Sequence, residues 1–146
     1  MASSLIVVDG YVAIYRDRFE GFVTSLEGVR EKADPYQIHS ALAAVFDLAS
    51  HCNQFIENEK PWALAKDPEQ TTRLDAVLYH LADSLRILAI LLSPVLPQAA
   101  LGIAAQLNWD RPFALADAKW GGLPDGHQLG AGTPLFPRLE PPATAE

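Results

Sequence analysis

Cysteine and long apolar runs are scarce in this sequence, and each shortage excludes a class of protein. Cys52 is the only cysteine, so the chain has neither an internal disulfide framework nor a cluster of thiolate metal ligands. The longest apolar stretch, residues 87–92, is much shorter than a membrane span, and residues 1–8 lack the basic start of a signal peptide. These features predict a cytoplasmic chain that enters no membrane.

Basic residues are also few, with 11 lysines and arginines against 18 acidic residues and a formal net charge of −7. This balance argues against non-specific binding of nucleic acid through a broad basic surface, although a few residues can still make a local contact.

Sequence signals for a catalytic or metal site are absent as well. The four histidines are scattered, and no zinc-ligand, P-loop or dinucleotide-binding spacing occurs. His51 and Cys52 are adjacent, but neighbours on a helix point about 100° apart and form no nucleophile–base pair. We therefore expect no catalytic residue, no metal and no cofactor.

Apolar residues recur at helical spacing along most of the chain, and prolines mark where helices start. The pattern predicts long helices over residues 11–32, 35–59, 68–92 and 97–107, with a short helical piece at 61–66. The fold class is all-α, an antiparallel helical bundle followed by an irregular C-terminal wrap over residues 112–140. We expect one domain over residues 1–140, with a lead-in at 1–10 and a disordered tail at 141–146.

Two of these helices carry apolar stripes that should form the core. The stripe of the 35–59 helix includes Phe46 and Cys52, and the stripe of the 68–92 helix includes Leu78 and Leu85. Arg86 falls among the apolar residues of the second stripe. We expect it to extend to the surface or to pair with Asp47 or Glu57, and a contact with a phosphate is the less favoured alternative.

The corner between these two helices holds Pro61 and Trp62. Proline suits the first position of a helix and pushes Lys60, the residue before it, out of the helical region. Trp62 then falls in the first turn of a short helix. It could fill the end of the helix pair as a core residue, or it could be presented as a platform on which a nucleic-acid base stacks.

Several short motifs follow one another in the order and spacing of a known family. Residues 53–66 read NQFIENEKPWALAK, and later motifs are VLY at 77–79, LR at 85–86, LLSPVLP at 91–97 and QL at 106–107. The tail adds AKWGGLPDGH at 118–127 and PLFPR at 134–138. Together, over about residues 37–140, they resemble the anticodon-binding domain of methionyl-tRNA synthetases.

The resemblance implies a helical domain of the class I synthetase anticodon-binding type, with methionine-specific tRNA as its partner. It implies that Trp62 stacks on the first anticodon base, with Asn53 and Lys66 as supporting residues of the same motif. The HIGH-like and KMSKS-like motifs of the family's catalytic domain are missing. This chain alone is therefore expected to be inactive as a methionine–tRNA ligase and to need a catalytic synthetase partner.

One feature of the family pattern is missing. In the family an asparagine and an arginine, one turn apart on the first helix, also read the anticodon, but residues 1–10 contain neither type. Without that helix, apolar side chains over residues 11–26 and 38–56 should be bare, which favours a homodimer or a bound partner.

Two interpretations of the chain remain. The first is a tRNA-binding module that supports aminoacylation. The second is a free-standing helical protein-interaction or scaffold domain that has lost specific tRNA recognition.

Overall fold

The computed structural model describes residues 36–139, and every regular element in that range is helical. Three helices pack together, namely α2 (Tyr36–Glu59), α4 (Thr71–Leu92) and α5 (Pro97–Gln106). Shorter pieces are α3 (Pro61–Leu64) and the 3-10 helices η1 (Pro68–Gln70) and η2 (Leu115–Asp117). The all-α prediction is confirmed for this range, whereas the predicted helix at 11–32, the lead-in and the tail lie outside the described residues.

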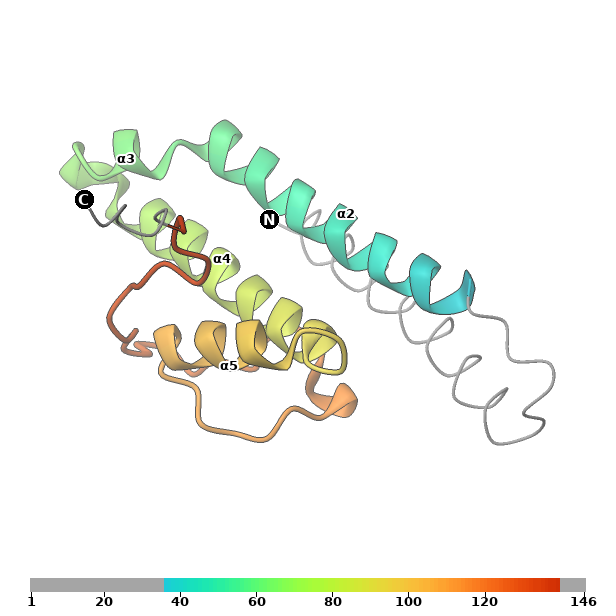
Figure 1. Cartoon of the computed structure of the whole chain (residues 1–146). Helices are drawn as coiled ribbons and strands as arrows, with labels where there is room; N and C mark the ends of the chain where they lie inside the picture. The colour runs from blue at the N-terminus through green and yellow to red at the C-terminus, as the bar shows by residue number, and fades with distance from the viewer. Residues whose placement is uncertain (1–35, 140–146) are drawn as a thin grey trace, which may run out of the picture.

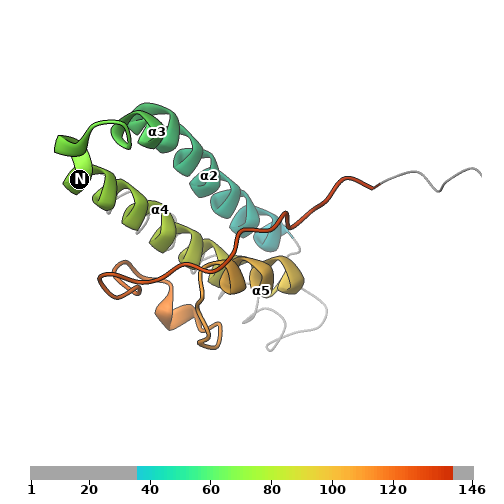
Figure 2. The same cartoon turned by 90° about the vertical axis from the view of Figure 1, so that its left-hand side faces the viewer.

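The helices α2 and α4 run side by side in opposite directions, and α3 lies at the end where they are joined (Figures 1 and 2). The helix α5 folds back along the C-terminal half of α4, away from α3 (Figure 1). None of the helices within residues 36–139 is long and apolar enough to cross a membrane.

Prolines set most of the helix boundaries. The helix α2 ends at Glu59 as predicted, and α5 begins at Pro97 as predicted. The helix α4 begins at Thr71 instead of Pro68, because the preceding residues form the 3-10 turn η1, in which the Asp67 side chain caps the amide of Glu69. The predicted helical piece at 61–66 is helical over Pro61–Leu64 and continues as a turn.

The core lies where α2, α4 and α5 meet the segment that follows α5. It contains the buried residues Ala41, Val45, Leu48, Ile87, Leu88, Ile90, Leu91, Ala104, Leu107, Trp109, Ala118 and Leu123. Cys52 is half-buried against this core, as its place in the stripe of α2 predicts.

Three residues of the predicted stripes lie outside the core. Phe46 is 57% exposed, Leu78 is 48% exposed and Leu85 is 42% exposed, so their assignment to the core is wrong. Leu78 and Leu85 lie seven positions apart on one face of α4, and neighbouring elements cover that face only in part at these two positions. The apolar stripe in the sequence is therefore wider than the face that neighbouring elements cover.

Arg86 is the largest fully buried side chain within residues 36–139, and its predicted partners are wrong. It reaches neither the surface nor Asp47 or Glu57; its Nε donates to Asp83 Oδ1 at 2.7 Å, and the two side chains are 1% and 0% exposed. The pair lies one turn apart on α4. A buried charge is stable only when it is paired and hydrogen-bonded, and Asp83 satisfies that requirement for Arg86.

The same ion pair attaches the irregular C-terminal segment to α4. The terminal nitrogens of Arg86 donate to the carbonyl oxygens of Asp117 at 2.8 Å and Lys119 at 2.6 Å. The backbone amide of Gly121 donates to Asp83 Oδ2 at 2.7 Å. Gly122 lies against the guanidinium so closely that a Cβ would collide with it. Residues 117–122 are thus held by three hydrogen bonds to one turn of α4.

We predict that Arg86→Ala destabilises the chain by about 3–5 kcal/mol, because it leaves the Asp83 carboxylate buried without its partner. The matched control is Arg73→Ala. Arg73 also pairs with a carboxylate, that of Glu59, at 2.9 Å, but its side chain is 56% exposed. An exposed pair contributes about 0–1 kcal/mol. Urea unfolding of both variants followed by circular dichroism measures the difference, and equal losses would contradict the prediction.

Candidate functional site

The corner between α2 and α3 is formed by the backbone around Lys60. Lys60 has φ 48° and ψ 62°, a left-handed conformation that ends α2. Its amide donates to the carbonyl of Ile56 at 2.9 Å, and its own carbonyl accepts from the amides of Ala63 at 2.8 Å and Leu64 at 3.2 Å. Pro61 begins the new helix in a position that needs no amide donor. Local backbone contacts therefore give the corner a defined geometry, and no residue of α3 is buried.

Trp62 lies on the surface of this corner. Its side chain is 51% exposed, and it is not part of the core cluster. The ring therefore does not plug the end of the helix pair. Trp62 is the second residue of α3, so the backbone contacts that fix the corner also fix the place from which its ring projects.

Two further contacts close the corner on the side of α4. Asp67 accepts a hydrogen bond from the amide of Glu69 at 3.0 Å and so caps η1. Arg73, in the first turn of α4, donates through Nε at 3.2 Å and Nη2 at 2.9 Å to one oxygen of Glu59 at the end of α2. Lys66 is exposed in the turn between α3 and η1.

The structure does not gather the three predicted site residues into one pocket. Asn53 is exposed on α2 and lines an open hollow of about 470 Å³ with Gln54, Ile56, Glu57 and Asn58. Neither Trp62 nor Lys66 lines that hollow. The exposed ring and the exposed lysine instead share the α3 turn, four residues apart.

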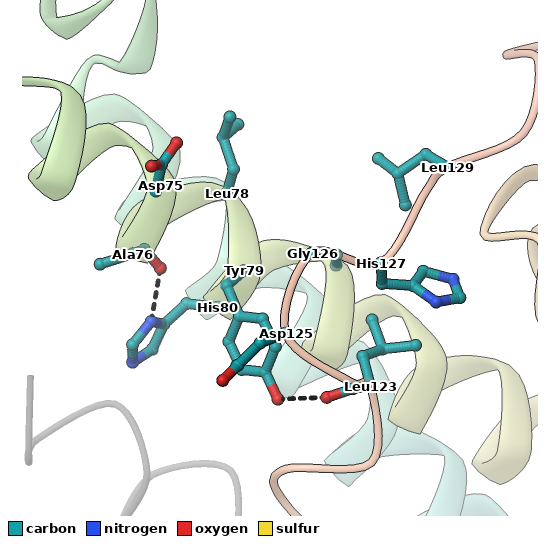
Figure 3. Close-up of a pocket in the computed structure, with 11 residues that line it drawn as sticks. Asp75, Ala76, Leu78, Tyr79, His80, Leu123, Asp125, Gly126, His127 and Leu129 are labelled. Atoms are coloured by element: carbon teal, nitrogen blue, oxygen red, sulfur yellow. Dashed lines mark hydrogen bonds between the residues drawn. The ribbon is translucent and has the colours of Figure 1, made fainter.

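A larger hollow of about 610 Å³, which the sequence did not reveal, lies between α4 and the segment near residue 125 (Figure 3). Asp75 and Asp125 line it, and no lysine or arginine does. Tyr79 donates its hydroxyl proton to the Leu123 carbonyl at 2.8 Å across this hollow. Burial raises the pKa of Tyr79, and Asp83 and Asp125 raise it further, while Arg86 opposes the shift. A hollow with this charge disfavours a phosphate.

His80 connects α2, α4 and the C-terminal segment beside that hollow. Its Nδ1 donates to the Ala76 carbonyl at 2.6 Å, and its ring lies 4.7 Å from the Trp120 ring and 6.1 Å from the Phe55 ring. Its Nε2 is buried and has no hydrogen-bond partner. This stack could not be predicted from the sequence, because its members come from three separate segments.

Cys52 does not have the surroundings of a nucleophile. Burial raises the pKa of its thiol, and a hydrogen bond with Ser84 offsets part of that shift. A reactive cysteine needs a lowered thiol pKa, which is the opposite shift.

The neighbouring His51 uses Nδ1 to donate to the Asp47 carbonyl at 3.0 Å. Across residues 36–139, no group of three His, Cys, Asp or Glu side chains could hold a metal ion.

Comparisons with known proteins agree on one family. The family model described as "Anticodon-binding domain of tRNA ligase" matches residues 22–120. The methionine–tRNA ligase of Enterococcus faecalis is 34% identical over 142 residues, which is 90% of this chain and 21% of that protein. The enzyme of Lactiplantibacillus plantarum is 39% identical over 127 residues, which is 84% of this chain and 19% of that protein.

A solved structure supports the same relationship. The apo form of Mycobacterium tuberculosis methionyl-tRNA synthetase matches with a TM-score of 0.69 and 26% identity, over 97% of this chain and 26% of that one. The resemblance to the anticodon-binding domain of methionyl-tRNA synthetases is thereby confirmed. The chain spans about a fifth of the length of these curated relatives.

We predict that the chain is more stable with glycine at position 60 than with a β-branched residue there. A left-handed backbone costs an L-residue about 1–2 kcal/mol, and glycine avoids this cost. Lys60→Val should therefore be less stable than Lys60→Gly by more than about 1 kcal/mol in urea unfolding. Lys66 has no left-handed backbone. The same two substitutions at Lys66 serve as the control, and an equal preference for glycine there would refute the explanation.

Proposed function

Because this chain belongs to the anticodon-binding domain family of tRNA ligases, we propose that it binds the anticodon loop of methionine tRNA through Trp62. It spans about a fifth of its curated relatives, so the proposal includes a catalytic domain from elsewhere. That domain is either the rest of a longer protein or a separate synthetase chain. Bound to it, the chain supports aminoacylation of tRNA in translation.

The observation that carries the proposal is the exposure of a large aromatic ring at a fixed corner. About half of the Trp62 side chain stays in contact with water, so it lacks part of the stabilisation that burial usually gives a tryptophan. A base that stacks on the ring covers the same surface. Because the corner is held by the backbone contacts of Lys60 and the cap of Asp67, the ring needs little reordering on binding.

Local charge at the corner favours RNA despite the acidic chain. Two acidic residues near Trp62 are already engaged, Glu59 in an ion pair with Arg73 and Asp67 in a hydrogen bond with the amide of Glu69. Lys60 and Lys66 flank Trp62 and are exposed. Neither takes part in an ion pair within the described part of the chain. These two ammonium groups can approach backbone phosphates while a base stacks on the ring.

The structure offers less support for a role of Asn53 in RNA binding than for Lys60 and Lys66. It lies exposed on α2, in the open hollow that it shares with Gln54 and Glu57. Its amide can donate to or accept from a base edge, but the neighbouring carboxylate of Glu57 disfavours a phosphate there.

A protein-interaction or scaffold function is the alternative, and one observation favours it. Phe46 projects from α2 with 57% of its surface exposed, as expected of a helix face that another helix or a second copy covers. The formal charge of −7 also disfavours RNA at long range. In this alternative the chain forms a homodimer or a protein complex and does not bind tRNA.

We predict that Trp62→Ala weakens tRNA binding by about 1–3 kcal/mol, the usual contribution of one base–aromatic stack. Its melting temperature should change little, because the ring is outside the core. The control is Phe136→Ala, which removes another exposed aromatic ring, 78% exposed, far along the sequence from the corner. Titration at one low salt concentration and a melting curve are measured for both variants.

Two results would contradict the proposal. Wild-type chain that does not bind tRNA at low salt would support the protein-interaction alternative. A stability loss of about 3–5 kcal/mol in Trp62→Ala would mean that the ring fills the core.

A further inference from the structure

A small hollow of about 190 Å³ lies where the C-terminal segment folds over α4, and its lining is cationic. Arg86, Arg111 and Lys119 line it, together with Asp117, Trp109 and Trp120. The lining therefore has three positive side chains and one negative side chain. This charge balance is opposite to that of the whole sequence, in which acidic residues outnumber basic ones. This hollow also contrasts with the hollow of Figure 3, which two aspartates line without a lysine or arginine.

The floor of the hollow is the buried guanidinium of Arg86. A guanidinium has five N–H donors, and three of them bond to Asp83, Asp117 and Lys119. Two donors remain uncommitted on a side chain that is only 1% exposed. Gly121 and Gly122 complete the lining, and the absence of a side chain at Gly122 is what allows the backbone to lie against the guanidinium.

The rim of the hollow carries two positive charges that form no ion pair within residues 36–139. Arg111 and Lys119 are exposed, and neither forms an ion pair in the described range. Arg86, by contrast, is neutralised by Asp83. The rim cations therefore supply the net charge, and Arg86 supplies oriented donors beneath them.

We propose that this hollow binds a phosphate group. A phosphate has several acceptor oxygens, so it can accept from Arg111 and Lys119 at the rim and from the spare donors of Arg86. Its source is either a backbone phosphate of the tRNA or a free phosphate, and only the first source rests on the proposed function. If the source is tRNA, the chain makes a second contact with the RNA at residues remote in sequence from Trp62. A contact with a backbone phosphate does not depend on the identity of the neighbouring base.

The first experiment uses the isotopically labelled chain and sodium phosphate, with sodium acetate at equal ionic strength as the control anion. Phosphate should produce saturable NMR shifts confined to the amides of residues 117–122 and the indoles of Trp109 and Trp120. Acetate should produce shifts at least tenfold weaker. No saturable shift, or an equal response to acetate, would overturn the proposal.

Two variants test whether the named residues hold the phosphate. The double substitution Arg111→Ala and Lys119→Ala should abolish the phosphate response, whereas Arg138→Ala, which removes another exposed cation, should leave it unchanged. Asp117→Asn should tighten binding several-fold, because it removes the negative charge and keeps the carbonyl that Arg86 uses. This gain cannot arise from a loss of folding. An unchanged response in the double variant would overturn the assignment.

The source of the phosphate is decided by the salt dependence of tRNA binding. Loss of one backbone contact lowers the slope of log K against log salt by about 0.7–0.9. The double variant should show this decrease, and Trp62→Ala should not. An unchanged slope with an intact phosphate response would assign the hollow to free phosphate. If wild-type chain binds no tRNA, the proposed function is wrong. The phosphate titration still tests whether the hollow binds phosphate.

Discussion

The buried ion pair of Arg86 and Asp83 is the interaction on which the C-terminal part of the structure depends. Both groups lie on one turn of α4, almost without solvent contact, so each would be very costly to bury alone. Together they bind the backbone at Asp117, Lys119 and Gly121. A segment with almost no regular secondary structure is thereby given a defined path. The cationic hollow exists because that path passes over the guanidinium.

The corner at Trp62 is built in a different way. Its geometry comes from the left-handed Lys60, from Pro61 and from the Asp67 cap, and very little of it is buried. This independence from the core allows a large aromatic ring to be exposed without loosening the helices. For the proposed function, it also means that an acidic chain needs no broad basic surface to bind RNA. In the proposed function the contact with RNA is local, because Glu59 is paired with Arg73 while Lys60 and Lys66 form no ion pair within residues 36–139.

The sequence predicted those features that depend on neighbouring residues. Pro61 and Pro97 marked helix starts correctly, and the effect of Pro61 on Lys60 placed the break between α2 and α3. The partner of Arg86 was missed, although the spacing of Asp83 and Arg86 puts them one turn apart. Its other partners are carbonyls more than 30 residues away, which no local pattern encodes. The hollows of about 610 Å³ and 190 Å³ also join distant segments, so periodicity could not reveal them.

The central claim is that this chain contacts the anticodon end of tRNA, and footprinting of the RNA tests it most directly. Methionine tRNA is cleaved by hydroxyl radicals with and without the full chain at low salt. Protection should be confined to the anticodon arm, strongest in the loop, because the contact consists of one stacking ring with two flanking lysines. Protection of the acceptor stem instead of the loop, or no protection at concentrations that saturate binding, would contradict the account.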